Sequence, residues 1–175
     1  MNNVTVVSLQ ARDAETRNDA LSEILIACVN SGASVSFMAP LSREKAHSFW
    51  RDVANSVREG ERILLGTIEE RTGHVVGTVQ IILKQPENQP HRADVAKMLV
   101  HPDSRRRGVG ALLMASAEDF ARDARKTLLV LDTASGGDAA RLYARMGWVR
   151  VGSIPDYALW PDGRLCDTTI FYKRL

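Results

Sequence analysis

The chain has 175 residues, and 23 Lys and Arg residues against 21 Asp and Glu residues leave a formal charge of +2. This length predicts one domain, spanning residues 1–175, with its own hydrophobic core. The near-neutral charge argues against a nucleic-acid partner, and the lack of an apolar run of about 20 residues argues against a membrane partner. With no apolar leader and no CxxC spacing between Cys28 and Cys166, we expect a cytoplasmic protein without a disulfide framework or a metal site.

Apolar periodicity predicts two amphipathic helices in the first third of the chain. The first carries apolar residues three and four positions apart, at Leu21, Ile24, Leu25, Cys28 and Val29. The second lies between Ser42, a candidate N-cap, and Gly60. Residues 63–68 and 75–83 are typical of strands, the second of them rich in β-branched residues, and predict an antiparallel hairpin.

The second half of the chain alternates strands and helices. The predicted elements are a strand at 94–101, a helix at 109–124, a strand at 128–131, a helix at 139–146 and strands near 148–154 and 168–172. The full order is therefore two helices, a β-meander, a βαβ unit, and a final helix with a hairpin. This order indicates the α/β class with a mixed sheet.

The junction between the strand ending near Val100 and the following helix carries the clearest chemical signal. Gly108 and Gly110 stand at the first turn, where helix amides lack internal acceptors and the helix dipole is positive. Three arginines, Arg105 to Arg107, precede the glycines and can add charge-assisted hydrogen bonds. The pattern predicts a pyrophosphate site. It is neither a dinucleotide fingerprint, because position 113 is Leu113, nor a P-loop.

The run Arg105-Arg106-Arg107-Gly108-Val109-Gly110 resembles the Arg/Gln-x-x-Gly-x-Gly/Ala motif of the GCN5-related N-acetyltransferases, the GNAT family. A downstream block of Ala139, Leu142, Tyr143, Gly147 and Trp148 resembles the second conserved segment of that family. The resemblance implies the GNAT fold: a mostly antiparallel sheet with a splayed parallel pair, flanked by about four helices. It also implies that the cofactor is acetyl-CoA.

The resemblance assigns cofactor contacts to the strand, the loop and the helix start. The implied cofactor-binding residues are Met98, Leu99, Val100, Arg105, Arg106, Arg107, Gly108, Val109, Gly110, Ala111 and Tyr143. One position departs from the family, because Gly136 stands where many members have an Asn that contacts the pantetheine arm. Binding of the arm then depends more heavily on backbone atoms of the strand.

Three side chains are candidates for the chemistry. An alkylamine with a pKa near ~10.4 is almost entirely protonated at pH 7, so acetyl transfer needs a proton acceptor. Asp94 opens one strand and Asp132 ends the next, so either carboxylate is a candidate base, directly or through water. By resemblance, Tyr143 points at the thioester sulfur as a hydrogen-bond donor, and the amide of Leu99 stabilises the developing oxyanion. Neither cysteine lies in these motifs, which favours direct attack by the amine.

Structural interpretations of the same residues stay open at this point. Tyr143 lies on an apolar helical stripe and can be a packed core residue. Asp94 can be a surface residue at a strand end, and Asp132 can form a turn. The arginines can be a solvated charge run, and His91 and His101 are minor candidates for the base.

Two further segments, 32–38 and 161–165, resemble a branch of the family that acetylates the β-lactam toxin tabtoxin. The resulting hypothesis is an N-acetyltransferase whose partner is a small-molecule amine, a polar metabolite or an antimicrobial, with a role in antibiotic resistance. Dimerisation is common in the family, so a homodimer is expected. The alternatives are a protein or peptide N-acetyltransferase and a non-catalytic acyl-CoA-binding sensor.

Overall fold

The computed structural model describes residues 4–175, so the first three residues of the expected 1–175 domain lie outside it. A single seven-stranded sheet runs through the molecule in the order β1-β2-β3-β4-β5-β7-β6. The strands are β1 (Val4–Ser8), β2 (Arg62–Glu69), β3 (Val75–Ile82), β4 (Arg92–Val100), β5 (Leu128–Ala134), β6 (Val149–Leu159) and β7 (Leu165–Arg174). The helices are α1 (Ala11–Thr16), α2 (Asn18–Asn30), α3 (Arg43–Arg58), α4 (Val109–Asp123) and α5 (Asp138–Arg145), with a short 3₁₀ turn, η1 (Pro102–Ser104), before α4.

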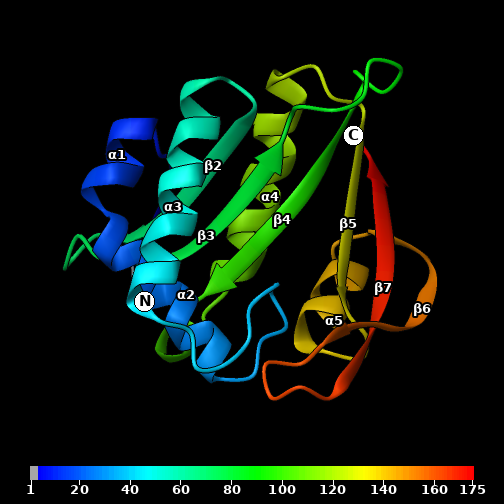
Figure 1. Ribbon diagram of the computed structural model, residues 1–175. Helices are drawn as coiled ribbons and strands as arrows, with labels where there is room; N and C mark the ends of the chain where they lie inside the picture. Colours follow the sequence, from blue (N-terminus) through cyan, green and yellow to red (C-terminus); the bar gives the residue numbers. More distant parts are fainter. Residues whose placement is uncertain (1–3) are drawn as a thin grey trace.

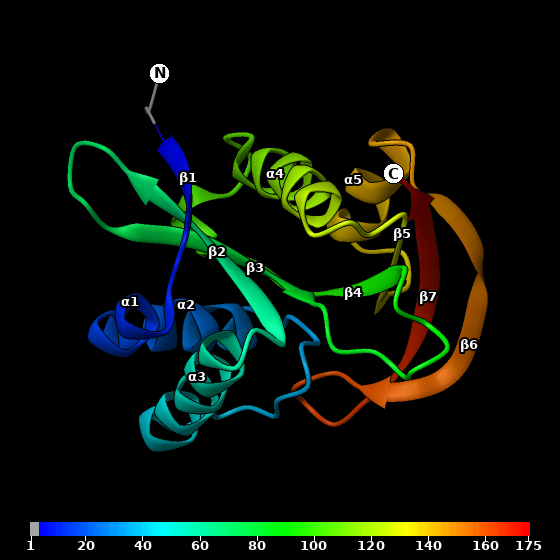
Figure 2. The same cartoon turned by 90° about the horizontal axis from the view of Figure 1, so that it is seen from above.

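Helices cover both faces of the sheet. Helices α1, α2 and α3 lie on one face, and α4 and α5 lie on the other, as the view from above shows (Figure 2). Each face has its own apolar cluster: Trp50 and Leu64 belong to the first, and Leu113 and Leu129 to the second. The sheet is therefore the shared wall of two cores, and its strands are buried where helices cover them.

Most of the predicted elements are confirmed. The β2–β3–β4 meander is antiparallel, and β4 pairs with β5 in parallel through the α4 crossover. Ser42 caps α3, because its Oγ accepts a hydrogen bond from the N–H of Lys45 at 3.2 Å. The predicted mixed α/β sheet, with its splayed parallel pair, is thus the one observed.

The beginning of the chain was predicted wrongly. Strand β1 and helix α1 precede the first predicted helix, so the chain does not start with two helices and a meander. Five strand residues and six helix residues are too few to show a period clearly. The closing strands are also longer than predicted; they pair with each other as a hairpin, and β7 pairs with β5.

Strands β4 and β5 are paired over only three residues each. The parallel register runs from Arg92 opposite Leu128 to Asp94 opposite Val130, and beyond it the two strands diverge (Figure 1). On its other side, β4 carries a bulge, where the register with β3 shifts between Thr78 and Gln80. A bulge bends the strand that contains it. The result is a wedge-shaped gap between β4 and β5, open at the end where η1 and α5 begin. We call it the β4–β5 gap.

Within the described residues, no helix combines the length and the apolar character that a membrane crossing requires.

Candidate active site

The loop from η1 to α4 is shaped for an anion by its backbone. Arg106 and Gly108 both have left-handed backbone angles, with φ of 61° and 81°. Gly108 is the N-cap of α4, and the first turn of that helix contains no acidic side chain. Alternation of left-handed residues with ordinary ones turns successive N–H groups toward one side, and the first amides of α4 add to them. The loop therefore has the donors and the dipole that a pyrophosphate needs.

The two glycines of this loop serve different purposes. A Cβ on Gly108 would meet no atom within 4 Å, so this position needs glycine for its left-handed angle. A Cβ on Gly110 would lie 3.2 Å from Leu142 Cδ2 and 3.6 Å from Met98 Sδ. Gly110 therefore lets α4 approach α5 and β4 closely. The sequence pattern did not distinguish these two purposes.

The three arginines also divide. Arg105 turns back to α2, where its Nε donates to Val100 O at 3.2 Å and its Nη2 to Ser31 Oγ at 2.9 Å. Arg106 pairs with Asp138 at the start of α5, with Nη2 and Oδ2 3.2 Å apart. Among the described residues, Arg107 is the one of the three with neither an ion pair nor a side-chain hydrogen bond.

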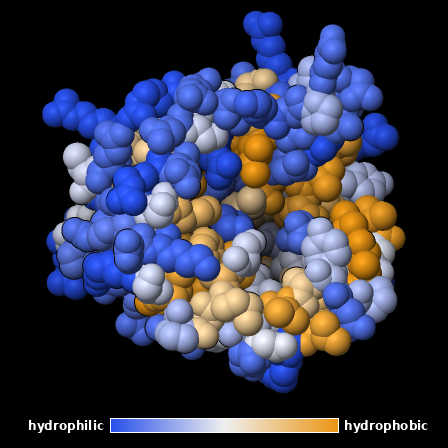
Figure 3. Space-filling model, in the orientation of Figure 1, coloured by the Kyte–Doolittle hydropathy of each residue, from blue (hydrophilic) through white to orange (hydrophobic). Residues whose placement is uncertain are grey.

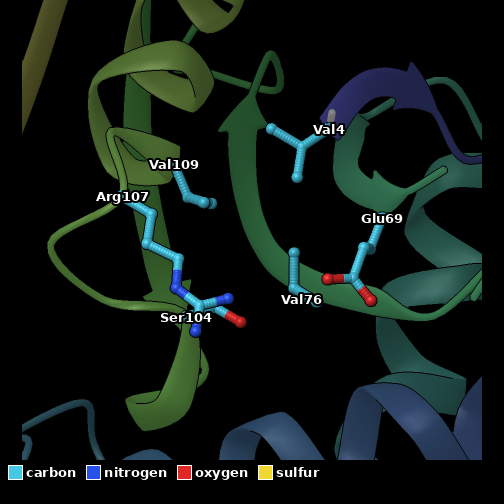
Figure 4. Close-up of a pocket in the computed structure, with 6 residues that line it drawn as sticks. All are labelled: Val4, Glu69, Val76, Ser104, Arg107 and Val109. Carbon is cyan, nitrogen blue, oxygen red and sulfur yellow. The ribbon is translucent and has the colours of Figure 1, made fainter. Parts of the chain in front are cut away.

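A small hollow is lined by Arg107, Ser104 and Val109 together with Val4 on β1, Glu69 on β2 and Val76 on β3. Figure 4 shows the Glu69 side chain facing this hollow. In this close-up the guanidinium lies beside Ser104, at the start of the loop. Arg107 is therefore the arginine whose guanidinium is left free by the described residues, whereas Arg105 anchors the loop and Arg106 joins the starts of α4 and α5.

The edge of β4 that faces the gap presents Val100. His101 N–H donates to Val76 O at 2.9 Å, and Val100 is the partner of Gly77 in the register. Because hydrogen-bonded pairs alternate along an antiparallel ladder, the N–H and C=O of Val100 point away from β3. Its C=O accepts from Arg105 and from Cys28, and its N–H is directed toward the gap. The same alternation directs the Leu99 amide toward β3, so Val100 replaces Leu99 as the candidate oxyanion donor.

The two candidate carboxylates differ in their surroundings. Asp94 is the last residue of β4 that pairs with β5. Arg92 forms an ion pair with its carboxylate, and Gln85 Nε2 donates to it at 3.1 Å. Asp132 lies two residues beyond the last paired residue of β5 and is exposed. Its one side-chain hydrogen bond in the described chain comes from Thr168 Oγ1, at 3.2 Å. Asp132 is therefore the carboxylate with lone pairs available inside the gap.

Tyr143 is packed in the core and is also close to the gap. Its side chain is buried, with its ring centroid 6.0 Å from that of Trp148 and 5.9 Å from that of Phe171. Burial, and then the charge of Asp132, raise the pKa of Tyr143 well above its usual value of 10.0. The hydroxyl is thus held protonated. The core interpretation and the donor interpretation of Tyr143 are compatible.

Several residues singled out in the sequence lie elsewhere or have other contacts. His101 Nδ1 accepts from Asp103 N–H at 3.3 Å and caps η1, and His91 is exposed in the loop before β4. Gly136 has a left-handed φ of 75°, and its C=O accepts from Arg141 Nη1 at 2.9 Å. The turn before α5 is therefore closed by a hydrogen bond from the Arg141 side chain to the backbone, where the family often has an Asn.

Two loops far apart in sequence meet across the open end of the gap. Ser34 Oγ donates to Leu159 O at 2.9 Å, and Ala39 N–H donates to Pro161 O at 3.0 Å. These bonds join the α2–α3 loop to the tip of the β6–β7 hairpin, and both views show the two segments side by side (Figures 1 and 2). On the same face, Figure 3 shows a recess between the helical side and the hairpin side. The sequence did not predict that these two segments are bonded to each other.

Known structures share this architecture over nearly the whole chain. A ribosomal-protein-alanine N-acetyltransferase from Brucella melitensis is 22% identical, with a TM-score of 0.79 over 98% of this chain and 99% of that one. A GCN5-related N-acetyltransferase from Kribbella flavida is 18% identical, with a TM-score of 0.79 over 98% of each chain. A Salmonella typhimurium protein, solved with its cofactor acetyl-CoA, is 19% identical, with a TM-score of 0.79 over 99% and 95% of the two chains.

At these identities the likeness concerns the fold, which is that of a GNAT enzyme. The family itself is shown by the model of the acetyltransferase (GNAT) family, which matches residues 26–148. The chain belongs to the acetyltransferase (GNAT) family. The matched residues begin within α2 and end just after α5. They include the loop before α4, the strands β4 and β5, and all three catalytic candidates.

Proposed function

We propose that the protein is an acetyl-CoA-dependent N-acetyltransferase whose acceptor is the amine of a small polar molecule. The observation that supports a small acceptor is the pair of hydrogen bonds, Ser34 to Leu159 and Ala39 to Pro161, which bridge the open end of the gap. A long peptide needs an open groove along the sheet, whereas this bridge closes one side. A small amine can enter and reach Asp132 without opening it.

The residues around the gap fit acetyl-CoA. The left-handed loop at Arg106 and Gly108 and the first amides of α4 would hold the pyrophosphate, with Arg107 adding charge. The unpaired N–H of Val100 would face the thioester region from β4. Acetyl-CoA supplies an acetyl group on a thiol that can leave.

The remaining steps belong to two side chains and one backbone amide of this chain. Asp132 takes the proton that the attacking amine must lose, directly or through one water. The Val100 N–H stabilises negative charge on the carbonyl oxygen, and the protonated Tyr143 donates a hydrogen bond to the departing sulfur. Asp94, engaged by Arg92 and Gln85, holds the closed end of the gap.

A covalent acyl-cysteine has no place in this scheme. Cys28 is buried, its Sγ donates to Val100 O at 3.4 Å, and burial raises the pKa of its thiol. A nucleophile needs the thiolate form, which burial disfavours. Cys166 is buried on β7, and its Sγ donates to the Asp167 carbonyl. Direct attack by the amine is the mechanism that these surroundings favour.

The test is a thiol-release assay with purified protein, acetyl-CoA and three acceptor groups: small polar amines, β-lactam amines related to tabtoxin, and peptides with a free alanine or lysine amine. The tabtoxin arm is included because residues 32–38 and 161–165, which resemble that branch, lie in the two bridged loops. We expect turnover with small amines and at least tenfold lower kcat/KM with peptides. Peptide preference would favour a protein acetyltransferase, and binding of acetyl-CoA without any turnover would favour a sensor.

We also propose that the protein acts in the cytoplasm as a homodimer. The apolar side chains left exposed on the edge strand β6 include Val149, Val151, Tyr157 and Leu159, and orange residues gather on that side of Figure 3. Exposed apolar groups of this extent often mark an association surface. Light scattering of the purified protein gives its mass and decides between monomer and dimer.

A further inference from the structure

Lys97 is a positive charge beside the gap that the acetyl-transfer scheme leaves without a role. It stands in the bulge of β4 with a left-handed φ of 50°, and it is half-buried. Its Nζ donates to Ser36 Oγ at 3.0 Å, in the α2–α3 loop that bridges the gap. Among residues 4–175, no carboxylate oxygen lies within 4.0 Å of this ammonium. Its hydrogen-bond partner is therefore a neutral hydroxyl, and its charge is not balanced by a direct ion pair.

A second cation occupies the same face of the neighbouring strands. Arg62, at the start of β2, donates from Nη1 to Gln80 Oε1 on β3. In the described chain, Arg62 Nε and Gln80 Nε2 are both buried without a hydrogen-bond partner. Burial lowers the pKa of Arg62 and of Lys97, and the charge of Arg62 lowers that of Lys97 further. Two cations and two donor groups without partners thus lie on this face.

The opposite wall of the gap is negative. Asp132 on β5 acts on Lys97 electrostatically and raises the pKa of Lys97, opposing the effect of burial. The two groups form no direct ion pair, so their charges remain separated across the gap. One wall therefore offers a cation and the other a carboxylate, which is the charge arrangement that complements a zwitterion.

We propose that the acceptor amine carries a carboxylate, and that Lys97, supported by Arg62 and Gln80, binds this carboxylate while Asp132 receives the amine. The acceptor class is then an amino acid or an amino-acid-like antimicrobial. This inference rests on the proposed function, and it concerns the specificity of the same site. The neutral hydroxyl of Ser36 accepts a hydrogen bond from Lys97 Nζ, and the carboxylate of the acceptor would take its place.

The arrangement also explains the unusual backbone at the bulge. In a regular β-strand, successive side chains point to alternate faces of the sheet. The extra residue of the bulge, at Lys97, interrupts this alternation. Asp94 and Ala96 share the face opposite the α4 core, since Ala93 and Val95 pack into that core. The bulge adds Lys97 to this acceptor face, beside the point where β4 leaves β5.

The test compares amino acids with the amines that lack only their carboxylate. Suitable pairs are L-methionine with 3-(methylthio)propylamine, L-phenylalanine with phenethylamine, and γ-aminobutyrate with propylamine, each rate being referred to the neutral amine. For the wild type we expect kcat/KM at least tenfold higher with the carboxylate-bearing member of a pair, the range of a hydrogen bond to a charged group. For Lys97→Met we expect the two members to differ by less than about threefold.

A matched control and a second readout separate the possible failures. Lys84→Met removes a lysine that is 69% exposed and ion-paired to Glu61, and it should keep the wild-type preference. Calorimetry in the presence of coenzyme A should show the N-acetyl amino acid binding to the wild type and at least tenfold more weakly to Lys97→Met. Lys97→Gln replaces Lys97→Met in both measurements if circular dichroism shows that the latter is unfolded.

Equal or better turnover of the carboxylate-free amines by the wild type would overturn this inference and leave the proposed function standing. Equal losses on both members of a pair in Lys97→Met would also overturn it, because they would indicate a role for Lys97 in proton transfer or folding. If the wild type acetylates no small amine at all, the proposed function fails and this inference fails with it.

Discussion

The proposed cofactor side and the proposed acceptor side of the β4–β5 gap are built by different means. The cofactor side is one continuous segment, from Val100 to Gly110, and it offers mainly backbone N–H groups in a loop with left-handed residues. The acceptor side combines side chains from distant segments: Lys97 on β4, Asp132 on β5 and Tyr143 on α5.

Because of this difference, substitutions on the two sides should change different properties of the protein. A site made of amides and glycines binds the same group whatever the neighbouring side chains are, because it depends on backbone geometry. A site made of side chains changes its ligand when one of them changes. Substitutions on the acceptor side should therefore alter turnover and specificity while acetyl-CoA still binds. Substitutions in the loop should affect acetyl-CoA binding first.

The largest effect is expected for Asp132→Asn, which should lower kcat/KM about 100- to 1,000-fold, as loss of a general base does. The Kd for acetyl-CoA, measured by calorimetry, should change by less than about twofold, since the loop is untouched. Asp94→Asn is the matched control. Because Arg92 and Gln85 already engage that carboxylate, its loss of kcat/KM should stay below about tenfold. Equal losses in the two variants would contradict the assignment of the base.

Tyr143→Phe should lower kcat by about 10- to 100-fold with little change in acetyl-CoA affinity, because only the hydroxyl is removed and the ring packing is kept. The pKa of Tyr143 is raised, so the hydroxyl stays protonated as the pH rises through 10. Ionisation of Tyr143 should therefore not lower the wild-type kcat near pH 10. In this range the pH profiles of kcat for the wild type and for Tyr143→Phe should have the same shape.

The same shift has a consequence for stability. Above pH 10 the unfolded chain loses the phenolic proton that the folded chain keeps, so the free energy of unfolding should fall as the pH rises, and less steeply in Tyr143→Phe. Tyr157→Phe, at an exposed tyrosine of β6, is the control for both readouts. An unchanged kcat in Tyr143→Phe would leave this tyrosine with a packing role alone.

On the cofactor side, Gly110→Val should weaken acetyl-CoA binding about tenfold. A Cβ at Gly110 already comes within 3.2 Å of Leu142 Cδ2, so a branched side chain must displace the first turn of α4. Gly152→Val is the control, because a Cβ at that position of β6 meets no atom within 4 Å. If Gly110→Val bound acetyl-CoA as tightly as the wild type, the close approach of α4 to α5 would not be needed for the site.

The smallest effects should distinguish two neighbouring arginines. Arg105→Ala removes exposed hydrogen bonds to Val100 and Ser31, and should lower the free energy of unfolding by less than about 1 kcal/mol. Arg107→Ala should leave the Tm unchanged and weaken acetyl-CoA binding about threefold, an effect that added salt diminishes. The opposite pattern would mean that Arg105 serves the cofactor and Arg107 the fold.

The sequence was sufficient for the mixed sheet, for the meander, and for the loop that precedes α4. Long periodic helices such as α4 show their spacing directly, and the glycine and arginine run is continuous in the chain. Strand β1 and helix α1 escaped prediction because each is shorter than the window in which a period can be recognised.

What the sequence by itself determined is therefore local: helix faces, strand runs, and a backbone loop whose residues are adjacent. Only the tertiary structure decided which groups face the gap. It separated Asp132, which is exposed, from Asp94, engaged by Arg92, and it put Lys97 on the same face of the sheet as Arg62 and Gln80. Such choices depend on the bulge, on the divergence of β4 from β5, and on contacts between distant segments, and none of these leaves a pattern in neighbouring residues.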